Sequence, residues 1–159
     1  MTDRPQTTKT RAVGWLVLPT RLALGGIFTF AGVLKLLDPQ SFAFAVKGFK
    51  VLPDHLIVPT AFAVPTIEIL AGVLLILGLW TRASALTIFL LLIGFTVGMG
   101  AVIHRGESIK CTCFGKIEWP CSGAIGTCHL IRNSVLGLMA IVIVAWGPGP
   151  LVIDRQRQR

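Results

Sequence analysis

The sequence predicts an all-α, polytopic membrane protein, a four-transmembrane-helix bundle with a cysteine-rich loop between the third and fourth helices. Composition is the first reason: hydrophobic residues make up 53% of the 159 residues and charged residues only 14%, whereas about a quarter of a soluble domain is charged. The second is four continuous apolar segments, each long enough for the ~20 helical residues that cross about 30 Å of hydrocarbon. The third is that these segments do not alternate apolar and polar residues, which excludes a closed β-barrel.

The predicted spans leave one membrane domain with two basic tails. The spans cover residues 13–37, 56–80, 83–103 and 129–146. Arg21 interrupts the first apolar run and no small-residue cleavage site follows a short core, so we expect a retained helix and not a signal peptide. The expected divisions are a basic cytoplasmic N-terminal tail (1–12), the four-helix membrane domain (13–153) and a basic C-terminal tail (154–159).

The three connections between the spans differ in character. The first is expected to lie in the membrane interface, because it carries the apolar side chains Phe42, Phe44, Val46 and Phe49. The second, residues 79–82, is almost absent. The third is the polar window that holds all four cysteines, Cys111, Cys113, Cys121 and Cys128.

The basic residues predict orientation and not nucleic-acid binding, because the net charge of +8 is scattered between apolar segments and forms no phosphate-binding face. An even number of spans places both termini on one side. That side carries Arg4, Lys9, Arg11, Arg82, Arg155, Arg157 and Arg159. The opposite side carries Lys35, Lys47, Lys50, Arg105, Lys110 and Lys116. The slight excess and the compact terminal clusters favour cytoplasmic termini, which puts the cysteine loop on the periplasmic or extracellular side.

Glu68 lies near the middle of the second span, where a carboxylate is costly and is expected to have a partner in the bundle. Arg21, Gly25, Phe28, Gly32 and Lys35 fall in one stripe of the first helix. We expect this stripe to face the second span and Glu68 to pair with Arg21 or Lys35, whose glycine neighbours permit close approach. Three interpretations stay open: charges that fix helix packing, a polar site for a quinone head group or a proton path, and a protonated Glu68 with no charged partner.

Four interpretations compete for the cysteines. A zinc site has enough ligands, but the spacing does not match paired C-x-x-C, and none of the recognised iron–sulfur spacings is present. Two structural disulfides would staple the loop, and four thiols in one loop suit a compartment where disulfides persist. Thiol–disulfide exchange is the fourth interpretation, and its residues would then be catalytic; no metal is assigned.

Three local features favour exchange. Cys111 and Cys113 are one residue apart, so a bond between them would be strained and reducible. Lys110 adjoins Cys111, and a neighbouring cation favours the thiolate. Thr127 is the expected N-cap of the last helix, which places Cys128 in its first turn; Arg132 then follows one turn later, and both the helix dipole and this cation favour the Cys128 thiolate.

CTCFG at 111–115, a Gly/Pro loop and LIRN at 130–133 together resemble the MauE family of methylamine-utilisation membrane proteins, within the wider DoxX-like group of four-helix membrane proteins. TRLALGGIFTFAGVLKLLDPQSF and PTIEILAGVLLILGLWTR resemble the first two helices of that group, and the likeness covers about 14–146. Cys121 and Cys128 are additional to the CxC core of the motif. The resemblance implies a multi-pass protein of the bacterial cytoplasmic (inner) membrane that helps to mature methylamine dehydrogenase, a periplasmic protein rich in disulfides. It also links the group to quinone-dependent oxidoreduction, so quinone is the implied cofactor class for a site at Glu68, Arg21, Lys35 and Arg132.

Three functions are therefore expected in order. The first is a thiol–disulfide oxidoreductase, in which Cys111 and Cys113 exchange with a periplasmic thiol or disulfide-bearing protein and electrons pass to the other cysteines or to a quinone near Glu68. The second is a non-enzymatic assembly factor whose disulfides only hold the loop together. A small transporter using the buried charges ranks last, because four short helices leave little room for a pathway. The lipid bilayer is a partner in every case.

Overall fold

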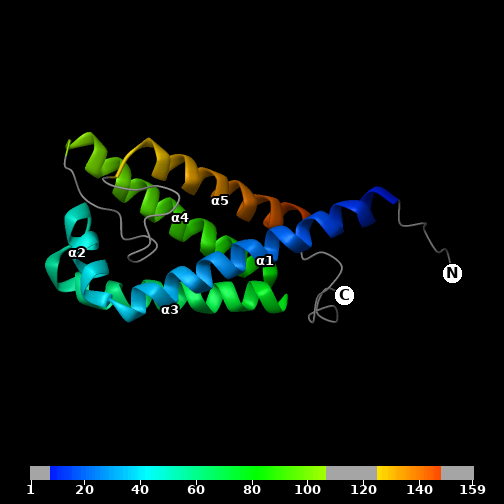
Figure 1. The fold of residues 1–159 in the computed structure, drawn as a ribbon, viewed down its shortest axis with the longest axis horizontal. Helices are drawn as coiled ribbons and strands as arrows, with labels where there is room; N and C mark the ends of the chain where they lie inside the picture. Colours follow the sequence, from blue (N-terminus) through cyan, green and yellow to red (C-terminus); the bar gives the residue numbers. More distant parts are fainter. Residues whose placement is uncertain (1–7, 107–124, 148–159) are drawn as a thin grey trace.

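The computed structural model describes residues 8–106 and 125–147, and these form five helices (Figure 1). The helices are α1 (Thr8–Leu37), α2 (Pro39–Phe49), α3 (Asp54–Leu77), α4 (Thr81–His104) and α5 (Thr127–Trp146). Four of them are long and apolar enough to cross a membrane: α1 from Val17, α3, α4 and α5. The predicted four-span, all-α fold is confirmed. Cys111, Cys113 and Cys121 lie outside the described residues, as do the C-terminal tail and residues 1–7 of the N-terminal tail, whereas residues 8–12 already belong to α1.

The second span ends earlier than predicted. The apolar run suggested a helix to residue 80, but α3 ends at Leu77 because Gly78 adopts a left-handed conformation (φ 73°) and closes the last turn through its N–H. Trp80 is also left-handed (φ 47°) and stands at the start of α4. Two left-handed residues within three positions reverse the chain, so the run that looked continuous is a helix end and a tight turn.

The long helices alternate in direction and form a closed ring. Figure 1 shows α1 and α4 running toward the α2 end of the molecule and α3 and α5 running away from it. Contacts join α1 to α3, α3 to α4, α4 to α5 and α5 back to α1, with the most extensive between α1 and α3. The larger apolar core fills the centre and contains Leu24, Leu75, Ile88, Ala140 and Ile143. The first predicted connection forms helix α2. It covers the end of the bundle at which α1 ends and α3 begins (Figure 1).

Glycines bring α1 and α3 into backbone contact. A Cβ atom on Gly25 would lie 2.8 Å from the carbonyl oxygen of Gly72, and one on Gly32 would lie 2.8 Å from that of Pro65. A Cβ on Gly72 would meet Thr29 and the Gly25 carbonyl. These separations leave no room for a methyl group. The predicted stripe of α1 therefore faces the second span, as expected, and the glycines set the distance between the two helices.

Helix α2 is anchored at both of its ends. Asp38 caps its N-terminus by accepting hydrogen bonds from the backbone N–H of Ser41 at 3.2 Å and from its hydroxyl at 2.9 Å. At the other end, Arg105 Nη2 donates to the carbonyls of Gly48 (3.3 Å) and Phe49 (2.7 Å). Arg105 follows the last residue of α4, so this contact ties the end of α2 to the end of α4. Phe42, Val46 and Phe49 are buried and Phe44 is exposed.

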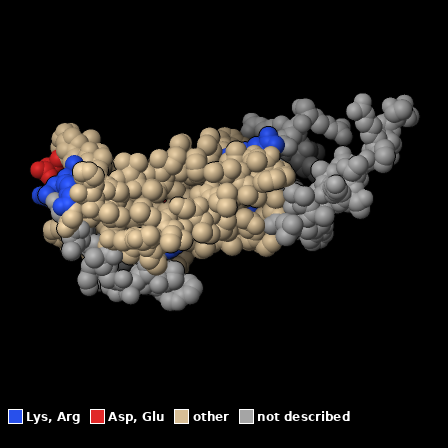
Figure 2. Space-filling model, turned by 90° about the horizontal axis from the view of Figure 1, so that it is seen from above, with Lys and Arg blue, Asp and Glu red and all other residues tan. Residues whose placement is uncertain are grey.

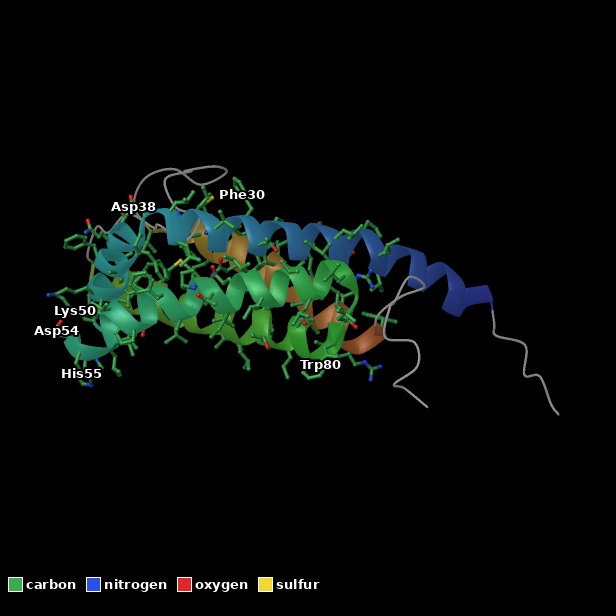
Figure 3. The ribbon with its side chains drawn as sticks, turned by 90° about the horizontal axis from the view of Figure 1, so that it is seen from below. Phe30, Asp38, Lys50, Asp54, His55 and Trp80 are labelled. Carbon is green, nitrogen blue, oxygen red and sulfur yellow. The ribbon has the colours of Figure 1, made fainter. Side chains whose placement is uncertain are left out.

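The charges of the described surface gather at the ends of the bundle. Figure 2 shows flanks of mostly uncharged residues, with basic and acidic side chains at the α2 end and basic side chains toward the other. In Figure 3, Asp38, Lys50, Asp54 and His55 lie at the α2 end and Trp80 at the opposite end, while Phe30 projects outward from α1. Large apolar side chains such as Phe30, Leu70 and Leu138 are exposed on the flanks. In water this surface would be unfavourable, and it is the surface that a bilayer covers.

Candidate functional site: a buried ion pair and a cysteine at a helix start

Lys35 and Glu68 form a buried ion pair at the centre of the bundle. The Lys35 ammonium donates to Glu68 Oε1 at 2.6 Å and to Oε2 at 2.8 Å. The two side chains are 2% and 1% exposed, so the pair has no contact with the surroundings of the protein. Each charge offsets the high cost of burying the other, and the two-point geometry satisfies both carboxylate oxygens.

The antiparallel register of α1 and α3 explains why the pair forms. Gly25 lies opposite Gly72 and Gly32 opposite Pro65. Extending this register places Lys35 opposite Phe62, six residues from Glu68 and therefore about 9 Å away along the helix axis. Helix side chains lean toward their own N-terminus, so in an antiparallel pair Lys35 and Glu68 lean toward each other and close this gap.

Two aromatic rings and a small cavity complete the surroundings of the pair. The Lys35 ammonium lies 4.6 Å from the ring centre of Phe95 and 5.1 Å from that of Phe42, within the range of favourable cation–π contact. A cavity of about 20 Å³ adjoins the pair and is lined by residues of all four spanning helices. It has room for about one water molecule.

Polar residues of α5 face the same region. Asn133 lines the cavity and its amide donates to the Thr96 hydroxyl at 3.4 Å, which in turn donates to the Leu92 carbonyl at 2.7 Å. Arg132, which precedes Asn133, is half-buried and does not line the cavity. Of the four residues proposed from sequence for a polar site, the centre therefore brings Lys35 and Glu68 together.

Arg21 belongs to a different level of the bundle. It is buried, as the stripe predicted, but it precedes Lys35 by fourteen residues, which is about 21 Å along α1. Glu68 is held by Lys35, so of the two predicted partners the structure selects Lys35. Arg21 and Glu68 are not parts of one site.

Cys128 is the cysteine that lies within the described residues, and it occupies the first turn of α5 with its side chain exposed. The predicted N-cap is wrong by one residue: the cap is Gly126, and Thr127 is already helical. The buried side chain of His129 supplies the capping contact, because its Nδ1 accepts the backbone N–H of Gly126 at 3.3 Å. A Gly cap has no side chain of its own to offer, so the helix start depends on the third helical residue.

Comparison with known proteins identifies the family. The sequence model of methylamine utilisation protein MauE matches residues 13–146. The chain belongs to the MauE family. The methylamine utilization protein MauE of Paracoccus denitrificans is 28% identical over 130 residues, covering 80% of this chain and 68% of that protein. No solved structure matches the chain. The chain is thus a multi-pass membrane protein of the MauE family, and the matched region contains both the ion pair and all four cysteines.

Sequence reasoning missed the aromatic and polar surroundings of the pair. Phe42 and Phe95 looked like ordinary apolar residues, and nothing in their spacing marks them as neighbours of a lysine. Asn133 and His129 carried a usable signal, since a polar side chain in an apolar span is expected to face the bundle. Both are buried. Their burial also places the α5 face that they share with Leu136 and Ala140 toward the centre.

Proposed function

We propose that the chain is a membrane component of methylamine utilisation that exchanges disulfides with a partner on the outer side of the bacterial inner membrane. The observation that carries this proposal is Cys128: it is exposed, it stands in the first turn of α5, and its sulfur is disulfide-bonded and not a thiol. A disulfide at the surface is open to attack by a partner thiolate. The membership of the family supports the pathway.

The chemistry follows the usual exchange sequence. A thiolate of a partner dithiol attacks one sulfur of the disulfide, a mixed disulfide forms and the other sulfur leaves as a thiolate. The second partner thiol then attacks the partner sulfur of the mixed disulfide and displaces this chain's sulfur as a thiolate, so the partner gains a disulfide and this chain gains two electrons and two protons. A quinone is the class of two-electron acceptor that would restore the disulfide. Cys128 is suited to be the leaving thiolate, because the helix start and Arg132 one turn later both favour negative charge there.

The proposed partner is a disulfide-rich periplasmic protein such as methylamine dehydrogenase. Such a protein must acquire its disulfides after export, on the side where the cysteine loop is expected from the distribution of basic residues. The α2 end of the bundle is the end at which α4 finishes and α5 begins, so Cys128 stands at that end (Figure 1). A partner would therefore meet the protein at this end.

The Lys35–Glu68 pair supports a second candidate, a polar site for a quinone head group or for a proton. Its buried position beside a cavity shared by four helices favours a role in holding charge within the membrane. The cavity of about 20 Å³ takes a water-sized molecule and not a ring. A quinone head group at the pair would require the helices to separate. Of the two roles, a proton path is therefore the one that is compatible with the packing.

Trapping tests the exchange proposal. Variants with single substitutions, among them Cys128→Ser and Cys113→Ser, are expressed in cells that produce a disulfide-rich exported protein, and thiols are blocked with a maleimide before electrophoresis. Exchange predicts an adduct between the chain and the exported protein that disappears on reduction and that accumulates in at least one variant, because the resolving thiol has been removed. A variant with serine at all four positions is the negative control.

If the disulfides only hold the loop together, a different result of the trapping experiment is expected. In that case every variant folds less stably, no adduct is captured, and the disulfides of the unaltered chain stay oxidised throughout growth. That result would reject exchange and leave the assembly-factor function. Glu68→Gln in the otherwise unaltered chain tests the second candidate, the polar site at the Lys35–Glu68 pair. A proton or quinone role there predicts that adducts still form but that reoxidation of the chain stops.

A further inference from the structure

A lateral groove lies between α2, α3 and α4. It has a volume of about 270 Å³ and its walls are apolar apart from Thr60. Phe42, Val46 and Phe49 line it from α2, Val64 from α3, and Leu90 and Phe95 from α4. Leu90 and Val51, which both line it, are exposed, so the groove opens on the flank that faces the hydrocarbon. An occupant must therefore come from the bilayer.

Two glycines of α4, Gly94 and Gly98, lie four residues apart and shape this groove in different ways. A Cβ on Gly98 would lie 2.8 Å from the ring of Phe49, so Gly98 lets α2 close one end. A Cβ on Gly94 would meet nothing within 4 Å, although Gly94 lines the groove. Gly94 is therefore not needed for contact between helices of this chain. Its missing side chain leaves space in the groove.

The outer end of the groove is basic. Lys50 stands between Phe49 and Val51, which both line the groove, and Lys47 precedes them on α2. Both lysines are exposed at the α2 end of the bundle, where Figure 3 shows Lys50. Asp54 lies 3.7 Å from Lys47 and offsets part of its charge. Arg105 adds a third cation and fixes α2 in place through the carbonyls of Gly48 and Phe49.

We propose that this groove holds one acyl chain of an anionic phospholipid, whose phosphate is bound at the rim by Lys50 and Lys47. An apolar channel with a basic end matches an apolar chain with an anionic head. The volume is below the ~300–1,000 Å³ of pockets that enclose whole ligands, which suits a single chain. The rings of Phe42 and Phe95 separate the groove from Lys35, so the head group stays at the rim and does not reach the ion pair.

Native mass spectrometry of the purified full chain tests the proposal. The protein is delipidated in detergent and offered equal amounts of phosphatidylglycerol and phosphatidylcholine. We expect one phosphatidylglycerol to be retained, with a preference of about fivefold, the factor that one basic residue supplies at an anionic head group. Gly94→Leu, which fills the groove, is expected to lose the bound lipid. Lys50→Asn, which removes the charge and suits the left-handed backbone there, is expected to lose the preference while retaining a lipid.

Matched variants make the outcomes decisive. Gly100→Leu has equal space for its side chain but does not line the groove, so it is expected to bind as the unaltered chain does. Val64→Trp fills the groove from α3 and is expected to reproduce Gly94→Leu should that variant fold poorly. Retention of lipid by both filled variants would overturn the proposal, as would equal binding of the two lipids by the unaltered chain. Competition by glycerol phosphate would show a free phosphate site, and a dimer lost on filling the groove would show a second copy as occupant; either result also overturns it.

Discussion

The α1–α3 seam and the surroundings of α4 use glycine in opposite ways. Along the seam, Gly25, Gly32 and Gly72 bring two backbones so close that a single methyl group has no space. Around α4, Gly94 faces open space, and a second groove of about 280 Å³ adjoins the helix on its α5 side. The seam is closed and contains the Lys35–Glu68 pair; the flanks of α4 are open to the bilayer.

This difference shows where a small membrane bundle can accommodate buried charges. A buried ion pair is tolerated where the two helices that carry it are held at a fixed distance, because its stability depends on geometry more than on the presence of the charges. Open grooves offer no such control, and the two beside α4 have no charged side chain in their walls.

Removing one member of the ion pair is expected to have the largest effect. Glu68→Leu leaves the Lys35 ammonium buried without its carboxylate, which costs about 3–5 kcal/mol. The double variant Lys35→Met, Glu68→Leu removes both charges and is expected to recover most of that loss. The measurement is unfolding by sodium dodecyl sulfate in mixed micelles, followed by circular dichroism. Lys47→Met is the control, because its pair with Asp54 is exposed and contributes only about 0–1 kcal/mol. Equal stability of the single and double variants would contradict the role given to the pair.

A methyl group in the seam is expected to have the next largest effect. Gly72→Ala forces α1 and α3 apart, since its Cβ meets Thr29 and the Gly25 carbonyl, and overpacking of this kind costs about 1–3 kcal/mol. Gly26→Ala is the matched control on the neighbouring face, where nothing lies within 4 Å. It is expected to stabilise the helix by up to about 1 kcal/mol. If the two substitutions gave the same change in the unfolding midpoint, the seam would not be closed as described.

Arg105→Gln is expected to loosen the end of α2. It removes the charged donor to the Gly48 and Phe49 carbonyls, a loss of about 1.5 kcal/mol, at the lower end for hydrogen bonds to charged groups because the site is partly exposed. Faster hydrogen exchange of α2 amides, with α3 unchanged, is the expected readout. Lys47→Gln serves as the comparison, and equal exchange in both variants would show that Arg105 does not anchor α2.

His129→Ala is expected to give the smallest change. It removes the acceptor for the Gly126 N–H and frays the first turn of α5, at a cost of about 1 kcal/mol. Amide exchange at residues 127–130 measures this fraying directly. His104→Ala, at the exposed end of α4, is expected to leave that exchange unchanged. Because the helix start favours the leaving thiolate, fraying of the first turn of α5 in His129→Ala is also expected to slow thiol exchange at Cys128.

The sequence predicted the spans well because membrane helices must satisfy their own backbone groups and are long, uninterrupted and apolar. It predicted that Glu68 would find a basic partner on the glycine stripe, since an isolated carboxylate there is costly. It could not choose between Arg21 and Lys35, because that choice depends on the register of α1 against α3, which the glycines set only once both helices are placed. Phe42 and Phe95 could not be foreseen: Phe42 follows Lys35 by seven residues but meets it only because α2 folds back, and Phe95 reaches it from α4.

A thiol count on the reconstituted protein tests the proposed exchange most directly. The full chain in lipid nanodiscs is mixed, without any other oxidant, with a reduced protein that carries one dithiol, and free thiols on each protein are measured over time by mass-tagged maleimide. Exchange predicts that every disulfide gained by the partner is matched by two new thiols on this chain, and that Cys128 is among the residues tagged. A chain that stays fully oxidised while the partner stays reduced would contradict the proposal and leave its disulfides as structural.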